Sequence, residues 1–209
     1  MVRALDVATQ TAIRDRRVLI PRNFVLVTAK DFDDDSDVLW GFTDYGEDVV
    51  LNIVDGETLA TVSRTFLGDA RPILKMDPIP LKIGLEVDTT QVVLSQIHAG
   101  VQEMARGHNC RNVKVQIHRG YLDPASMLLV AAPRCRRLGQ INGMPIETPA
   151  IGGVGGITLK VVSHTRELTK TNTAKRSDET QRLRDGDRFR RYTGKKFDVW
   201  WGETKSDDI

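Results

Sequence analysis

Cysteine and histidine side chains are the residues of this chain best suited to binding a metal ion. His108-Asn109-Cys110 brings both ligand types together, and Cys135 is a candidate third ligand. Structural zinc sites usually separate paired ligands by two to four residues and repeat the pair elsewhere. Here one residue separates the pair and no second pair follows, so the sequence predicts no metal and no other cofactor. The two cysteines could form one disulfide, but they do not make a disulfide framework.

Nucleophilic catalysis has one candidate pair, Ser163 beside His164. Adjacent residues on a strand point to opposite faces, so this hydroxyl and imidazole would not meet. The acidic run "DFDDDSDVLWGF" lacks the Gly at position six and the Glu at position twelve of a calcium loop. "GGVGG" is not followed by the Lys-Ser/Thr of a phosphate-binding loop. The sequence therefore predicts no catalytic residues and a protein that is not an enzyme.

Residues 160–196 are basic and raise the question of nucleic-acid binding. They hold twelve Lys or Arg against five acids, and two aromatic residues among them, Phe189 and Tyr192, could stack on bases. The acids stand close to the arginines and can pair with them locally, which disfavours a phosphate partner. A disordered tail is a further alternative. We favour an ordered closing segment, because the following "KKFDVWWG" is too apolar to remain exposed.

The rest of the chain consists mostly of short β-rich runs separated by turn residues. Apolar spacing predicts helices over 3–16 and 98–106, and Ser177 or Asp178 could cap a short helix over 179–184. Pro21 predicts an edge or kinked strand, and Asp55-Gly56 predicts a hairpin turn. Strands are expected at 18–27, in three runs within 38–68, and at 71–75, 79–87, 91–97, 112–119, 127–131, 137–142 and 156–164. This pattern predicts a mainly β fold, an antiparallel barrel or sandwich with few helices.

The 209 residues are enough for one large domain or two small ones. Turn-rich seams suggest a first β domain over 1–86, a second over 87–165 and a basic extension over 166–209. The sequence has no apolar run long enough to cross a membrane, and its first residues lack the apolar centre of a signal peptide. We therefore expect synthesis in the cytosol with reduced thiols.

The stretch "VLWGFTDYGEDVVLN" and several other local patterns resemble one family, the phage tail-tip or baseplate hub proteins, which also occur in gene transfer agents. Three stretches of the β-rich part carry the likeness: "VLWGFTDYGEDVVLN", "LKIGLEVDTTQVVLSQIHAG" and "VKVQIHRGYLDPAS". "LGQINGMPIETP" extends it, and the basic region adds Arg176-Ser177-Asp178, Gln181, Gly186-Asp187, Phe189 and Tyr192. The resemblance covers most of residues 3–201 and contains no motif with catalytic chemistry.

The resemblance implies a structural virion protein built from hub-type β domains. Such a protein is made in the host cytoplasm and forms a homotrimeric ring that closes the tail tube at the tail tip. Its partners would be the distal tail protein, the end of the tape-measure protein and a central fibre or receptor-binding protein. A distal tail ring component is the nearest alternative. Some relatives hold an iron–sulfur cluster on four cysteines, but this chain has two, so no cluster is implied.

Charge distribution adds a hypothesis about how copies of the chain would meet. Residues 31–57 contain ten acids and no Lys or Arg, whereas 160–196 are basic. The two surfaces differ, so their contact between neighbouring copies would be head-to-tail and could close a ring. Nucleic acid is a disfavoured partner in this interpretation, and a basic-tailed nucleic-acid-binding protein is kept as an alternative. The candidate subunit-interface residues are Arg182, Arg184, Arg188, Phe189, Tyr192, Trp200 and Trp201.

Overall fold

The computed structural model describes residues 5–79, 86–151, 153, 155–169 and 175–192. The chain divides into two compact units, Met1–Thr169 and Lys170–Ile209, which we call the β body and the C-terminal unit. The predicted boundary between residues 86 and 87 does not divide the molecule. Strand β1 (Ile20–Lys30) from the first predicted domain pairs with β7 (Lys114–Leu122) from the second at eight positions. One sheet therefore includes strands from both halves.

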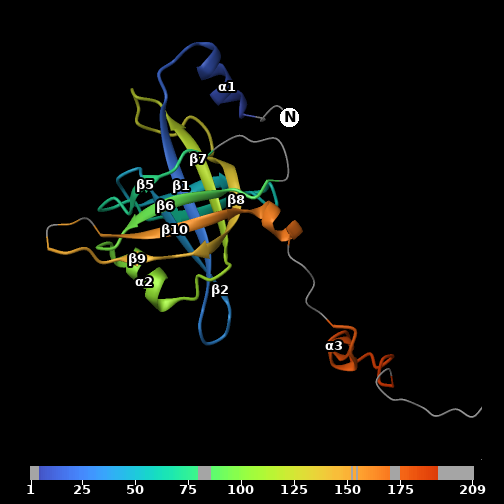
Figure 1. Ribbon diagram of the computed structural model, residues 1–209. Coiled ribbons are helices and arrows are strands. Elements are labelled where there is room, and N and C mark those ends of the chain that lie inside the picture. The colour runs from blue at the N-terminus through green and yellow to red at the C-terminus, as the bar shows by residue number, and fades with distance from the viewer. Residues whose placement is uncertain (1–4, 80–85, 152, 154, 170–174, 193–209) are drawn as a thin grey trace, which may run out of the picture. The chain divides into compact units, whose positions relative to one another are not determined.

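The β body is built on antiparallel strands, which confirms the mainly β prediction (Figure 1). Its central path runs in the order β2-β1-β7-β8-β10-β6-β5. The other strands are β2 (Asp37–Thr43), β3 (Val49–Val54), β4 (Thr61–Phe66), β5 (Ile73–Met76), β6 (Thr89–Ser95), β8 (Arg134–Gly143), β9 (Ile146–Glu147) and β10 (Gly156–Ser163). In Figure 1, β6 and β10 lie across the direction of β1, so the sheet twists strongly along its path.

Strand β1 is central for most of its length, which corrects the prediction of an edge strand from Pro21. Pairing with β2 begins only at Phe24, which lies opposite Thr43. Pro21 therefore lies where β1 has a neighbour on one side only, opposite Tyr121 of β7. The missing N–H of the proline removes no hydrogen bond to β2 there.

Side chains on β1 alternate between two apolar clusters, because successive residues face opposite sides of a sheet. Val25, Val27 and Ala29 belong to the main core, which also contains residues of β2, β5, β6, β7, β8 and β10. Phe24 and Leu26 face the other side, where Ile53 and Phe66 of the β3–β4 hairpin cover them. The Phe24 and Phe66 rings meet edge-on at 5.3 Å between centroids.

The β3–β4 hairpin forms where Asp55-Gly56 predicts it, but its loop is longer than a two-residue turn. Six residues, 55–60, separate the two strands. The Asp55 side chain accepts hydrogen bonds from the Glu57 and Thr58 N–H groups, each at 2.9 Å. Leu59 adopts a positive φ of 58°. The aspartate thus organises a wider loop than the Asp-Gly pair alone suggests.

The path is not a closed barrel, since it ends at β2 on one side and β5 on the other. In the described part of the chain, β5 pairs only with β6. Besides its pairing with β1, β2 has one isolated bridge, between Phe42 and Leu67. The outer edges of both strands thus retain backbone groups that a further strand could use.

Two helices of the β body lie where the sequence predicts them. Helix α1 (Val7–Arg14) is capped by Asp6, whose carboxylate accepts from the Ala8 N–H at 3.0 Å. Helix α2 (Ala99–Gly107) packs Val101 and Met104 against the main core. The 3-10 helix η1 (His164–Thr169) follows β10 directly. Among the described helices, none is long and apolar enough to span a membrane.

Two of the predicted strands, 79–87 and 127–131, are not among the strands that the structure describes. Residues 80–85, most of the predicted strand 79–87, lie outside the described residues. The predicted strand 127–131 is instead a loop that meets the sheet by one bridge, between Leu122 and Leu129. Asp123 bends the chain there, because its side chain accepts from the Ser126 hydroxyl at 3.3 Å and its carbonyl accepts from the Met127 N–H at 2.8 Å.

Candidate functional site

Residues 175–192, the described part of the C-terminal unit, contain one short helix, α3 (Asp178–Arg182), at the predicted place. Ser177 is its cap, and the serine hydroxyl accepts from the Thr180 N–H at 3.3 Å. The Ser177 and Thr180 hydroxyls also lie within 3.1 Å of each other. The prediction of a Ser177 cap is confirmed, and the helix begins one residue earlier and ends two residues earlier than expected.

Acids of the C-terminal unit pair locally, as the sequence indicates. Arg182 contacts Glu179 one helical turn earlier at 3.2 Å. Gln181 donates to Asp187 at 2.7 Å, and the Phe189 N–H donates to the same carboxylate at 2.9 Å. These hydrogen bonds lower the pKa of Asp187. Both carboxylates therefore have partners within their own unit.

The apolar side chains of the C-terminal unit are exposed. Leu183 is 87%, Phe189 84% and Tyr192 54% exposed, and the Arg191 guanidinium lies 5.6 Å from the centre of the Tyr192 ring. The predicted anchor residues Trp200 and Trp201 lie outside the described residues. Because isolated aromatic side chains gain by leaving water, Phe189 and Tyr192 suit a contact with another protein surface.

A groove of about 260 Å³ lies on the C-terminal unit. Its described lining includes four cations and three uncharged polar residues, and no Asp or Glu. The cations are Lys175, Arg176, Arg184 and Arg190. The lining of the groove is therefore cationic, although acids and bases alternate in the surrounding sequence. Of the predicted interface arginines, Arg184 lines the groove, whereas Arg182 and Arg188 do not.

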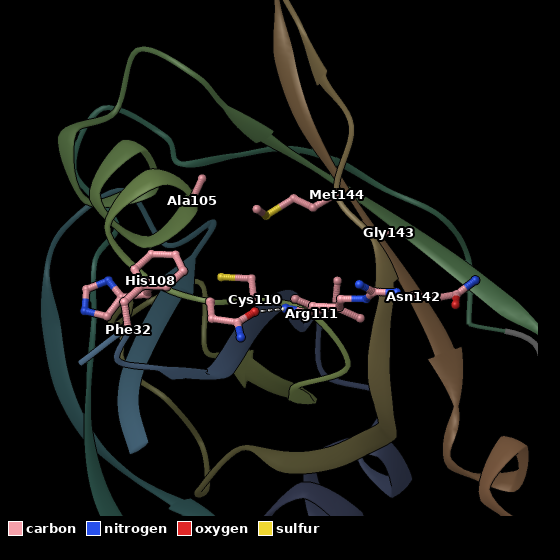
Figure 2. Close-up of a pocket in the computed structure, with 10 residues that line it drawn as sticks. Phe32, Ala105, His108, Cys110, Arg111, Asn142, Gly143 and Met144 are labelled. Carbon is pink, nitrogen blue, oxygen red and sulfur yellow. Dashed lines mark hydrogen bonds between the residues drawn. The ribbon is translucent and has the colours of Figure 1, made fainter. Parts of the chain in front are cut away.

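The structure places the proposed metal ligands His108 and Cys110 beside one pocket of about 350 Å³, without Cys135 (Figure 2). Figure 2 shows Cys110 and Met144 facing the space between α2 and the end of β8. Burial raises the pKa of Cys110 to about 11. The thiol therefore stays protonated, which makes it a poor ligand and nucleophile near neutral pH. Within the described residues, no three His, Cys, Asp or Glu side chains are placed to hold a metal ion.

Cys135 lies on β8, and both cysteines are free thiols. Burial is the main reason why the pKa of Cys135 is also raised to about 11. Its Sγ lies 3.3 Å from the Arg137 carbonyl oxygen. The possible disulfide between Cys110 and Cys135 is therefore not formed.

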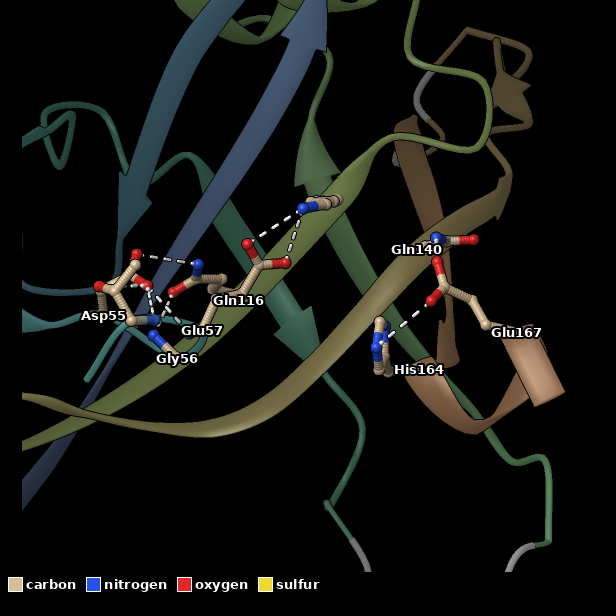
Figure 3. Close-up of polar contacts among 9 residues, drawn as sticks. Asp55, Gly56, Glu57, Gln116, Gln140, His164 and Glu167 are labelled. Atoms are coloured by element: carbon tan, nitrogen blue, oxygen red, sulfur yellow. Dashed lines mark hydrogen bonds and ion pairs between the residues drawn. The ribbon is translucent and has the colours of Figure 1, made fainter. Parts of the chain in front are cut away.

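Ser163 and His164 do not form a nucleophile and base pair. The Ser163 hydroxyl accepts from the Thr165 hydroxyl at 3.0 Å. His164 lies 3.4 Å from Glu167, and the other oxygen of that carboxylate accepts from Gln140 of β8 at 2.6 Å (Figure 3). These contacts attach η1 to the sheet. They fix where the chain leaves the β body.

Sequence reasoning missed a polar network that fastens the β3–β4 loop to β7 (Figure 3). Gln116 donates to Asp55 at 3.1 Å and accepts from the Gly56 N–H at 2.9 Å. Partial burial acts to raise the pKa of Asp55, but hydrogen bonds from Thr58, Glu57 and Gln116 lower it to about 2. A Cβ at Gly56 would lie only 2.7 Å from the Cys135 Sγ, so this close approach favours glycine.

His118 of β7 lies beneath this network and is fully buried. Its Nε2 lies 3.1 Å from the Val54 carbonyl oxygen, so the neutral ring donates from Nε2. Burial lowers the pKa of His118 to about 4. A neutral imidazole enclosed among strands joins β3 to β7 and has no access to a substrate.

Comparison with known proteins gives no relative for this chain: no protein-family model and no curated protein matches it.

Proposed function

We propose that this chain is a non-enzymatic structural protein of a phage tail tip, a baseplate hub component that assembles with copies of itself. The observation that carries the proposal is the exposure of Leu183, Phe189 and Tyr192 in the described part of the C-terminal unit. Exposed aromatic side chains beside paired charges are typical of subunit interfaces. The Ser177 cap and Gln181 fall within the segment that resembles tail-tip proteins.

Open edges on the β body support the same proposal. Strands β2 and β5 end the path of the sheet, and a ring of copies could use such edges by adding neighbouring strands. In the assembled virion, the chain would form a homotrimeric ring that closes the tail tube. It would contact the distal tail protein, the end of the tape-measure protein and the central fibre or receptor-binding protein.

The gene neighbourhood and the symmetry of the assembled particle test the proposal. We expect a tape-measure gene upstream, a large fibre gene downstream, and three-fold rings of the purified protein by electron microscopy. Six-fold rings would instead support the distal tail ring. A monomer at every concentration, encoded away from tail genes, would contradict both assignments.

The groove with four cations favours nucleic-acid binding as a second candidate function. Phosphate contacts weaken steeply with salt, so binding should be strongest at about 50 mM salt. A shift of single- or double-stranded DNA or RNA at that salt, lost at about 200 mM, would support this function. No shift at the lower salt would remove it.

A further inference from the structure

We infer that the basic groove of the C-terminal unit binds the acidic turn of a second copy of this chain. The basic groove is the surface lined by Lys175, Arg176, Arg184 and Arg190, and the acidic turn is residues 31–37, which connect β1 to β2 and include the first residue of β2. The inference rests on the proposed self-assembly, and it names the two surfaces that meet.

The lining of the groove is more uniformly positive than the sequence around it. The described C-terminal unit holds seven Lys or Arg and four acids. Glu179 pairs with Arg182, and Asp187 with Gln181. None of the four acids lines the groove. The surface of the groove is thus more positively charged than the sequence alone suggests. An anionic group would suit it as a binding partner.

The acidic turn holds five carboxylates in its seven residues. Its backbone is organised by its own side chains, since the Asp33 N–H donates to Asp31 at 2.8 Å and the Ser36 N–H to Asp34 at 3.0 Å. The Asp31 N–H also donates to the Ser36 carbonyl at 2.9 Å. A turn already held in shape presents its carboxylates with little further loss of conformational entropy on binding.

Charge within the turn is only partly balanced. Lys30 contacts Asp37 at 2.8 Å, and this contact is the main reason why the pKa of Lys30 is raised. The carboxylates of Asp33 and Asp35 lie further along the exposed turn. Guanidinium groups bind carboxylates through paired hydrogen bonds, so Arg176 and Arg184 suit these two aspartates.

A carboxylate partner fits the molecule better than a phosphate partner. The whole chain has a formal net charge of only +2, so it produces no strong overall field to attract nucleic acid. The complementary surface is already present on the chain itself. Because the groove and the turn are different surfaces, each copy can use both at once, and the contact is head-to-tail.

Two charge variants of the full chain test the contact. The groove variant is Arg176→Glu with Arg184→Glu. The turn variant is Asp33→Lys with Asp35→Asn, because asparagine tolerates the positive φ of 57° at position 35. We expect each variant to raise the dissociation constant for self-association at least about tenfold, measured by analytical ultracentrifugation.

Matched controls change the same charge at other exposed positions. Arg14→Glu with Arg17→Glu repeats the charge change of the groove variant at exposed positions of the β body, and Glu147→Lys with Glu103→Gln repeats that of the turn variant. Both controls should associate within about threefold of the natural chain, since they keep the surfaces that meet. Equal losses in variants and controls would overturn the inference.

Mixing the two variants gives the decisive measurement. The turn variant keeps an intact groove and the groove variant an intact turn, so a mixture should form heterodimers although each variant alone is monomeric. Such dimers cannot close a ring, because the remaining surfaces are both altered. No association in the mixture would overturn the contact between copies and indicate contact within one copy or none.

Other outcomes separate this inference from the proposed function. Three-fold rings that persist in the groove variant would overturn the named contact and leave the tail-tip proposal standing. Binding of an oligonucleotide that the groove variant loses, without any effect of the turn variant on self-association, would overturn it in favour of nucleic acid. Association should weaken between about 10 mM and 150 mM salt, where the screening length falls from ~30 Å to ~8 Å.

Discussion

The β body and the C-terminal unit use apolar side chains in opposite ways. In the β body, Phe24, Phe42 and Phe66 are fully buried. In the C-terminal unit, Leu183, Phe189 and Tyr192 are mostly exposed, and none of its described residues is buried. The difference indicates that the β body is stabilised by its own core, whereas the described residues of the C-terminal unit leave apolar surface that a partner could cover.

The largest expected difference in the free energy of unfolding is between alanine variants of two phenylalanines, one in each region. Phe42→Ala should lower the free energy of unfolding by about 3–5 kcal/mol, because it removes a buried ring from the main core. Phe189→Ala should change it by less than about 0.5 kcal/mol, because that ring is exposed. Urea denaturation of both variants checks the contrast. A large loss for Phe189→Ala would show that the C-terminal unit has a stabilising core after all.

Breaking a buried ion pair should cause the next largest loss of stability. Arg137 of β8 contacts the Asp88 carboxylate at 2.9 and 3.0 Å, and the guanidinium is 7% exposed. Asp88→Ala should cost about 3 kcal/mol, since it leaves a buried charge without its carboxylate. Glu179→Ala removes the exposed partner of Arg182 in the C-terminal unit and should cost less than about 1 kcal/mol. Similar losses for both, by thermal denaturation, would contradict the comparison.

Acid should destabilise the β body through His118. The pKa of His118 is about 4, below its ordinary value of 6.5, so between these pH values the unfolded chain binds a proton that the folded chain does not. Stability is therefore full above pH 6.5 and falls towards pH 4, by up to about 3 kcal/mol. Denaturation across this range should show the decline, and His118→Gln should flatten it. An unchanged slope would show that other groups cause it.

Removal of the whole C-terminal unit should also have only a small effect on stability. A chain that ends at Thr169 should unfold within about 1 kcal/mol of the full chain, because the buried apolar clusters belong to the β body. Differential scanning calorimetry checks this expectation. A large loss of stability would mean that the segment after Thr169 anchors onto its own body rather than onto a neighbour.

Local signals predicted much of both regions. Apolar spacing located α1 and α2, and Ser177 located the start of α3, because helix caps act over three or four residues. The single sheet could not be predicted in this way. Pairing of β1 with β7 joins residues about ninety positions apart, such as Val27 and Val115. No local pattern contains that pairing, so the turn-rich seam near residue 86 predicts a domain boundary, whereas the sheet includes strands from both sides of it.

Local sequence patterns could not predict the basic groove of the candidate site either. The sequence places Asp185 and Asp187 among arginines and predicts mutual neutralisation. The structure pairs Asp187 with Gln181 and leaves none of the described acids of this unit in the lining of the groove, where Arg176 and Arg184 lie. Likewise, the Asp55–Gln116 contact spans 61 positions, so neither residue indicates its partner. Contacts over such distances depend on the completed fold.

Strand β10 has a mechanical consequence for a protein that is pulled from its C-terminal side. Force applied beyond Thr169 reaches the sheet through η1 and then acts along β10, which lies between β8 and β6. Its antiparallel hydrogen bonds run perpendicular to the strand, so the bonds on both sides share the load and must break together. Force along β10 would therefore load many hydrogen bonds of the β body at once rather than unravel its strands one bond at a time.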